Sequence, residues 1–473
     1  MTTSAATVQI CHVDLATFSE LESFIYGGRD AMSYFLRSVQ KSNWFSFVPI
    51  RFTHLQNGDF AADFTCSLNR APDYILNVWS RVRVPQIQLN AAAVFADASI
   101  AWTRNFMHNL IETAYLHFNT LPVQKIESGW LDANYYFRVP GSKNVGYRNM
   151  IGDIAAMTTP VLPGVALGTG GWFNCPLPFW FAEDSGVALP TAALPFNDIE
   201  VQYRLRSWRN LLILNPGTAG GGGAAATYDD VHMTGSAITV APRILPEHVQ
   251  TWGHGAVVHN DERVRMGQAP RDILIHQVQS IPRATLDASA LGSQTSTNLR
   301  FSHAVTAVFY MARNISSRTG LTTGTDGPEH SNYTTEPNYA GLDPLAESAL
   351  IYENTIRFGI SSDYSSLVCP WYYSSAIPDD TGLHMLTYSL NPFSLDPMGS
   401  TNFSKLANVQ LISTISPAAV NAAAVAAPVD QTGAAILDYD GATVFPQRFE
   451  LMCFARNHNI GRVSGGSFGH PLL

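Results

Sequence analysis

In positions 199–206 the sequence reads Ile199-Glu200-Val201-Gln202-Tyr203-Arg204-Leu205-Arg206. Apolar side chains alternate here with polar ones, which is the period of a β-strand with one buried face. The same period returns near the C-terminus, where Phe449, Leu451, Cys453 and Ala455 alternate with Glu450, Met452, Phe454 and Arg456. We therefore expect a strand at each place, with Ile199 and Phe449 on the side that faces a core.

Short β-rich runs dominate the rest of the chain, and clusters of Gly, Pro, Asn, Asp and Ser separate them. The clearest runs are Asp272–Val278, Val305–Tyr310, Leu383–Leu390 and Val409–Ile415. Candidate helices are few and short: Leu15–Ile25, Trp102–Ile111 and Asn260–Met266. This pattern predicts an all-β chain of sandwich or jelly-roll architecture with long loops.

Two low-complexity loops, Pro216–Asp230 and Pro417–Gly433, lie in similar surroundings. An alternating strand leads into each loop, and another strand follows it. The leading strands are Val201–Leu205 and Val409–Ile415, and the following strands are Ile238–Val240 and Phe449–Ala455. The repeated order indicates an internal duplication.

The length of 473 residues exceeds one ordinary core, since a domain commonly holds roughly 100–200 residues. A charged stretch, Asn260-Asp261-Glu262-Arg263-Val264-Arg265-Met266, stands between the two β-rich halves. We therefore divide the chain into an N-terminal arm (1–26), a first β-domain (27–259), a linker (260–270) and a second β-domain with a C-terminal tail (271–473).

Composition excludes several classes of protein. Only 14% of the residues are charged, where about 25% is typical, so part of the surface is expected to meet protein. The net charge of −9 argues against direct nucleic-acid binding, because Lys and Arg dominate phosphate contacts. No apolar run approaches the roughly 20 residues of a transmembrane segment. No Lys or Arg precedes Arg29, and Asp14 interrupts the apolar start, so we expect neither a signal peptide nor secretion.

The five cysteines are Cys11, Cys66, Cys175, Cys369 and Cys453, and they form no C-x-x-C pair. Their odd number and wide spacing favour small buried core residues over zinc binding or redox chemistry.

Two glycine-containing patterns resemble catalytic motifs. Gly465-x-Ser467-x-Gly469 fits the hydrolase nucleophile pattern, which needs a strand-to-helix turn. Because only four residues follow it, we expect a flexible tail instead. The run Gly220–Gly223 lacks the Gly-Lys-Ser/Thr ending of a phosphate-binding loop, so a flexible loop is expected there too.

Metal and acid–base sites have weak signals. The histidines show no H-x-H or H-E-x-x-H spacing, and we expect His232, His248, His254 and His259 in loops or near the linker. The carboxylate pairs Glu183/Asp184, Asp229/Asp230 and Asp379/Asp380 are adjacent residues, which point to opposite faces of a strand or are solvated in loops.

Other candidate sites are sequons and tryptophans. The sequons begin at Asn314, Asn332 and Asn402, and they matter only in a secreted protein. The tryptophans Trp44, Trp172, Trp180, Trp208 and Trp252 suit core and interface packing better than sugar stacking. The sequence therefore predicts no catalytic, cofactor-binding or metal-ligating residue, and no cofactor.

Five separated stretches carry patterns specific to one family. They are Gly28–Phe47; Val187–Pro190 with Leu194–Val201; Asn260–Met266 with Arg271–Gln279; Leu390–Pro392 with Pro397–Leu406 and Asn408; and Phe454–Ile460 with Gly465-Gly466. In this order they resemble the double jelly-roll major capsid proteins of nucleocytoplasmic large DNA viruses, a family that includes phycodnavirus, iridovirus and marseillevirus proteins. The fourth stretch is the most specific, being similar to the family's "PSGT.NFSRIDN" signature. Departures are Leu406-Ala407-Asn408 for Ile-Asp-Asn and His276 for the usual Glu.

The resemblance implies two tandem eight-stranded jelly-roll barrels, residues 27–259 and 271–473, and a structural protein without enzymatic activity. It also implies a homotrimer that forms a pseudo-hexagonal capsomer and tiles the icosahedral shell of a large DNA virus. The implied partners are neighbouring capsomers, minor capsid proteins and penton proteins, and the N-terminal arm would meet minor capsid proteins or neighbouring capsomers. The implied location is the virion, with assembly in the host cytoplasm.

Two other classes remain as alternatives. One is a minor or vertex jelly-roll capsid protein, or a carbohydrate-binding β-sandwich. The other is a cupin-like or glycosidase-like enzyme. A large trimer interface would favour the capsid subunit, because obligate interfaces bury more area than transient ones.

Overall fold

The computed structural model describes residues 12–13, 16–17, 19–26, 29, 31–37, 39, 41–90, 96, 98–215, 242–268, 270–316, 330–336, 339, 341–424 and 446–470. The chain forms two compact units, Met1–Trp44 and Phe45–Leu473. Within the expected helix Leu15–Ile25, the first unit has a short 3-10 helix, η1 (Glu20–Phe24). The Ser19 hydroxyl oxygen caps it by accepting a hydrogen bond from the backbone of Leu21.

The first half of the second unit is built on eight antiparallel strands. They are β1 (Phe45–His54), β2 (Asp63–Ser67), β3 (Tyr74–Arg83), β6 (Ile111–Phe118), β7 (Leu121–Glu127), β9 (Trp172–Leu177), β10 (Ile199–Leu205) and β12 (Val249–Val258). Their order is β7-β6-β10-β2-β1-β12-β3-β9. Two short pairs flank them: β4 (Ile87–Gln88) with β8 (Ala166–Leu167), and β5 (Ser99–Trp102) with β11 (Leu212–Asn215).

The second half contains two antiparallel sheets, ordered β13-β22-β16-β19 and β15-β21-β17-β18. Their strands are β13 (Arg271–Ser280), β15 (Gln294–Asn298), β16 (Ala304–Asn314), β17 (Leu345–Tyr352), β18 (Thr355–Ser361), β19 (Leu383–Thr387), β21 (Val409–Ile415) and β22 (Phe449–Ser464). Three short strands join the first sheet: β14 (Ala284–Leu286), β20 (Thr401–Asn402) and β23 (Ser467–Gly469). The four expected β-rich runs are found as β13, β16, β19 and β21, although β19 ends at Thr387 and not at the expected Leu390.

The two halves repeat one strand order. Taken in chain order, β1, β2, β3, β6, β7, β9, β10 and β12 correspond to β13, β15, β16, β17, β18, β19, β21 and β22. With these substitutions, β7-β6-β10-β2 becomes β18-β17-β21-β15, and β1-β12-β3-β9 becomes β13-β22-β16-β19. The internal duplication that the sequence predicted is therefore confirmed by the topology.

Helices are more prominent than the sequence suggested. They are α2 (Phe106–Leu110), α3 (Ser128–Arg138), α4 (Gly141–Ile151), α5 (Ala155–Thr158), α7 (Asn260–Gln268), α8 (Cys369–Tyr373) and α9 (Pro417–Ala422), with short 3-10 turns η2 (Trp180–Ala182), η3 (Ser185–Val187), η4 (Thr191–Ala193), η5 (Trp208–Asn210), η6 (Pro246–His248) and η8 (Phe403–Lys405). The helix expected at Asn260–Met266 is α7, and only the end of Trp102–Ile111 is helical, as α2. The sequence missed α3 and α4, because α3 is buried on most sides and α4 is exposed on most sides. Neither helix shows the amphipathic period by which a helix is recognised.

The alternation expected in β10 is confirmed, with Ile199, Val201, Tyr203 and Leu205 buried. Arg206, expected on the polar side, is instead buried just past the strand. Its guanidinium donates hydrogen bonds to the Asn109 carbonyl (2.8 Å) and the Ser128 hydroxyl (3.1 Å). In β22 the prediction of one buried face is incomplete, because Met452, Phe454 and Arg456 are buried as well.

Parts of the predicted loops lie outside the described residues, including Pro216–Asp230 with Gly220–Gly223, and the strand expected at Ile238–Val240. The second loop, expected to start at Pro417, begins as helix α9. The Ser416 hydroxyl caps this helix by accepting from the backbone of Ala419.

Candidate assembly surfaces

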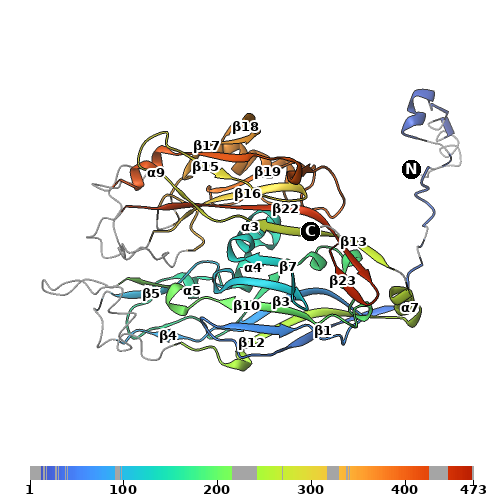
Figure 1. Cartoon of the computed structure of the whole chain (residues 1–473), viewed down its shortest axis with the longest axis horizontal. Coiled ribbons are helices and arrows are strands. Elements are labelled where there is room, and N and C mark those ends of the chain that lie inside the picture. The colour runs from blue at the N-terminus through green and yellow to red at the C-terminus, as the bar shows by residue number, and fades with distance from the viewer. Residues whose placement is uncertain are drawn as a thin grey trace, which may run out of the picture. The chain divides into compact units, whose positions relative to one another are not determined.

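The two halves meet through helix α3. Figure 1 shows α3 and β7 between the strands of the second half, above, and those of the first half, below. Trp130 on α3 packs edge-on against Phe309 of β16, with ring centroids 5.4 Å apart, and lies 6.0 Å from Phe454 of β22. A Cβ atom on Gly129 would stand only 3.1 Å from the Phe454 ring. This close packing explains why β22 is buried on both faces: Cys453 faces its own core, while Phe454 faces α3.

A buried polar cluster around Asp132 also joins the halves. One carboxylate oxygen of Asp132 lies 2.8 Å from His108 Nδ1, and the other accepts hydrogen bonds from Ser331 (2.7 Å) and Tyr333 (2.8 Å). His108 Nε2 lies 2.9 Å from the Tyr147 hydroxyl. Although Ser, His and Asp meet here, the serine donates to the aspartate and the carboxylate is fully buried. The arrangement fastens the segment after β16 to α3 and offers no exposed nucleophile.

A second buried contact pairs opposite charges. Arg456 of β22 lies 2.8 Å from the Glu183 carboxylate of the first half, and Arg138 of α3 lies 3.3 Å from it. Burial, reinforced by the nearby Arg456 guanidinium, lowers the pKa of His276 to about 2. The departure of His276 from the family's usual Glu therefore places a neutral ring in this contact.

The outer face of β1-β12-β3-β9 carries aromatic side chains. Trp79 of β3 and Trp252 of β12 are cross-strand partners whose rings stack with centroids 6.5 Å apart. His254 lies 4.9 Å from Trp79, and Phe47 lies 6.3 Å from His254. A groove of about 660 Å³ opens beside these rings, lined in part by Trp79, His254 and Met150 of α4. We call this surface the aromatic sheet face.

The segment after β18 forms another apolar surface. A π-helix, η7 (Tyr364–Val368), runs directly into α8. Its inner side is anchored by the buried Cys369, whereas Trp371 and Tyr372 are 68% and 71% exposed. Ile356 on the edge strand β18 is exposed as well. We call the surface of Ile356, Trp371 and Tyr372 the helix face.

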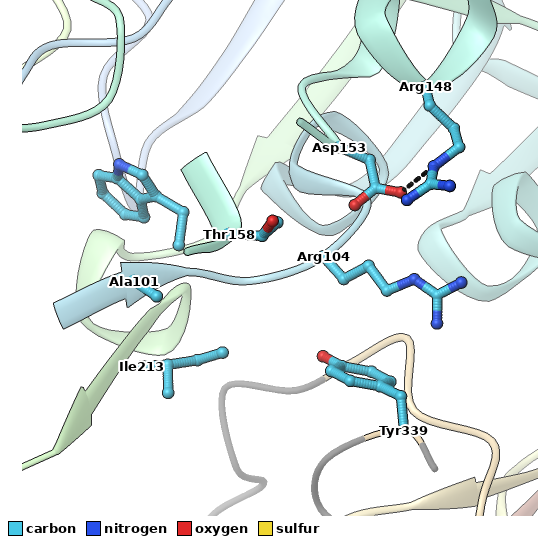
Figure 2. Close-up of a pocket in the computed structure, with 8 residues that line it drawn as sticks. Ala101, Arg104, Arg148, Asp153, Thr158, Ile213 and Tyr339 are labelled. Carbon is cyan, nitrogen blue, oxygen red and sulfur yellow. Dashed lines mark hydrogen bonds and ion pairs between the residues drawn. The ribbon is translucent and has the colours of Figure 1, made fainter. Parts of the chain in front are cut away.

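A polar pocket of about 290 Å³ lies near β5 (Figure 2). Arg148 pairs with Asp153 at 2.7 Å, and Arg104 lies over the Tyr339 ring at 5.1 Å. Arg104 also pairs with the nearly buried Asp380 at 3.2 Å. Because a carboxylate already pairs with each arginine, these contacts stabilise local structure.

The glycine motif near the C-terminus is a β-hairpin. Gly465 and Gly466 have positive φ angles of 59° and 81°, which suit the turn between β22 and β23. The flexible tail expected there is wrong up to His470, the last described residue. Phe468 is buried, since its ring stacks on that of Phe118 in the first half at 4.4 Å.

The other candidate residues fall in separate places. His254 lies within β12 and not in a loop, His248 ends η6, and His259 precedes α7, while His232 lies outside the described residues. Among the residues that the structure describes, no group of three His, Cys, Asp or Glu side chains could hold a metal ion. Asp184 caps η3, whereas its neighbour Glu183 takes part in the arginine contact. Asp229 and Asp230 lie outside the described residues.

The cysteine prediction holds for the four described thiols. Cys66, Cys175, Cys369 and Cys453 are free and buried, and Cys11 lies outside the described residues. Burial raises the pKa of Cys66 to about 12 and that of Cys369 to about 11.

Sequons and tryptophans have mixed outcomes. Asn314 and Asn332 are buried, and Asn402 has a structural role, because its side chain caps η8 by accepting from the backbone of Ser404. Trp180 is fully buried, whereas Trp44 is largely exposed. The sequence did not single out Trp79, Trp371 or Tyr372, because isolated aromatic residues carry no pattern.

Comparison with known proteins decides the family. Residues 33–242 match the profile of the major capsid protein N-terminus, and residues 262–469 match that of the large eukaryotic DNA virus major capsid protein. The chain is 41% identical to the major capsid protein of Costelytra zealandica iridescent virus, with 100% of both chains covered. It is 43% identical to that of Wiseana iridescent virus, with 98% of this chain and 94% of the relative covered. The chain belongs to the major capsid proteins of large eukaryotic DNA viruses.

Solved structures show the fold of this capsid protein. VP54 of PBCV-1 superimposes with a TM-score of 0.67 at 19% identity, covering 93% of this chain and 100% of that one. The Faustovirus major capsid protein gives 0.67 at 11% identity, covering 97% of each. The capsid protein is therefore mostly β, and its family is structural rather than enzymatic. Within its described residues, no helix is long and apolar enough to span a membrane.

Proposed function

We propose that three copies of this capsid protein form a pseudo-hexagonal capsomer, and that capsomers tile an icosahedral shell. The observation that carries the proposal is the matched strand order of the two halves. Two eight-stranded jelly rolls per chain give six similar blocks in a trimer, and six similar blocks suit a roughly hexagonal tile. Packed sandwiches also limit exposed strand edges, so that side-wall contacts set the geometry of assembly.

The domain boundaries belong to the same proposal. We divide the chain into an N-terminal arm (1–26), a first jelly roll (27–259), a linker (260–270) and a second jelly roll (271–473). Two observations support this division: α7 occupies most of the linker, and one profile match ends at residue 242, before the linker, while the other begins at residue 262, within it. Exposed apolar residues of the arm, such as Leu21 and Phe24, favour a protein partner for it. Minor capsid proteins, penton proteins and neighbouring capsomers are the proposed partners, within a virion assembled in the host cytoplasm.

The test is the mass of the purified full-length protein by size-exclusion chromatography with light scattering. We expect a particle of three chains of 51.6 kDa each. A strict monomer at micromolar concentration would contradict the proposed trimer.

A further inference from the structure

The repeated topology places α3 and the η7–α8 segment in corresponding positions. In the first half, α3 follows β7, the edge strand of its sheet. In the second half, η7 and α8 follow β18, which corresponds to β7 and is also an edge strand. Each helical segment therefore emerges from the same corner of its half. Each also precedes corresponding strands, β9 and β19.

The position of α3 shows what such a segment covers. Trp130 and Phe137 of α3 pack on Phe309, which is the cross-strand partner of Phe454. This aromatic pair lies between β16 and β22, on the face turned away from the core of the second half. Beside it, Gln277 of β13 donates a hydrogen bond to the β7 carbonyl of Val123 at 3.1 Å.

The corresponding surface of the first half carries a matching pair. The strands β3 and β12 correspond to β16 and β22, and their cross-strand partners Trp79 and Trp252 lie on the face turned away from their own core. Beside them, Phe45 and Phe47 of β1 are each 62% exposed. Thus an aromatic pair like that beneath α3 remains only partly covered in one chain.

The corresponding helical segment of the second half, η7–α8, likewise has an exposed outer side. Trp371 and Tyr372 project from α8 with more than two thirds of their surface exposed. Figure 1 shows β18 on one side of the second unit and β1 and β12 on the opposite side. Surfaces on opposite sides of one chain cannot contact each other. A single two-fold contact between two copies cannot bury both of them either.

We propose that the helix face of one copy docks on the aromatic sheet face of the next copy, as α3 docks on β16 and β22 within the chain. The contact repeats head to tail, because the same pair of surfaces is used at each step, and in the proposed trimer the third copy closes it into a ring. The groove beside Trp79 leaves room for an incoming aromatic side chain. This inference rests on the proposed capsomer and identifies the residues that would hold it together.

The experiment uses two interface variants of the full-length protein and one control. The helix-face variant is Trp371→Ser with Tyr372→Ser, and the sheet-face variant is Phe47→Ser with Trp79→Ser. Leu291→Ser is the matched control, since Leu291 is a comparably exposed apolar residue between β14 and β15. Mass is measured by light scattering, and circular dichroism verifies folding. If the sheet-face variant unfolds, Phe47→Ser alone replaces it, because Phe47 is exposed.

We expect the wild type and the control to be trimers and each interface variant to be a folded monomer. The dissociation constant should rise at least about a hundredfold, as for the loss of central aromatic contacts. An equimolar mixture of the two variants should give dimers and no trimers, since only one intact pair of faces remains.

Other outcomes separate this inference from the proposed function. A helix-face variant that remains trimeric like the wild type would overturn the docking surface and leave the capsomer intact. Monomeric variants that fail to pair when mixed would overturn the pairing of the two faces. A monomeric wild type would overturn the capsomer itself, and the docking surface with it.

Discussion

Arg456 Nη2 donates a hydrogen bond to His276 Nδ1 across 2.7 Å, at the place where β22 and β13 meet the first half. The accepting nitrogen carries no proton, so His276 is neutral and a proton on it would bring two cations together. The groups that face this ring are Arg456, Arg138 and His458, with Glu183 as the counter-charge of both arginines.

We predict that this contact makes the fold acid-sensitive. The pKa of His276 is lowered from 6.5 to about 2 in the folded protein. Below pH 6.5 this histidine is therefore protonated in the unfolded chain but not in the folded chain. Stability is therefore lost as the pH falls below 6.5. Between pH 6.5 and pH 5 the neutral His276 should lower the free energy of unfolding by about 2 kcal/mol. Chemical denaturation of wild type and His276→Gln at both pH values measures it, and equal losses in the two proteins would refute the assignment.

Replacing Trp130 should weaken the junction of the two halves. Trp130→Ala removes the ring that packs on Phe309 and Phe454 and leaves a cavity, at a cost of about 3–5 kcal/mol in the free energy of unfolding. Val145→Ala on α4 is the control, because Val145 is exposed and should change stability by less than about 0.5 kcal/mol. Similar denaturation midpoints for the two variants would show that α3 does not hold the halves together.

Removing the Asp132 carboxylate should be comparably severe. Asp132→Ala leaves His108, Ser331 and Tyr333 buried without their acceptor, and each unsatisfied group costs about 1–3 kcal/mol. Asp396→Ala, at an exposed position, is the control. Urea denaturation at neutral pH should show a loss of at least about 3 kcal/mol only for Asp132→Ala.

The C-terminal hairpin should detach when its anchor is removed. Phe468 stacks on Phe118, and its backbone N–H donates to the Asn197 side chain at 2.8 Å. Phe468→Ala should cost about 3 kcal/mol and expose the last residues to carboxypeptidase. Ser467→Ala, whose side chain is exposed, should remain as resistant as the wild type. Mass spectrometry after limited digestion distinguishes the two.

Local sequence patterns predicted a strand and its buried face correctly where only one face of the strand packs on a core. The alternation at Val409–Ile415 gave the bounds of β21, and the repeated loop context predicted the duplication that the strand order confirms. The pattern was insufficient at β22, where Phe454 looked like an exposed position. A second layer of protein covers it, and no local period encodes contact with a distant helix.

The sequence by itself therefore determined the β-rich class, the two halves and, through dispersed family motifs, the capsid family. Hydrophobic periods and turn residues act over a few neighbouring positions and can be read in order along the chain. Only the tertiary structure decided that Trp79 and Trp252 form a pair, that α3 covers Phe309 and Phe454, and that Trp371 and Tyr372 are left uncovered. These relationships depend on strand register and on packing between residues far apart in the chain, where the burial of one side chain is set by another.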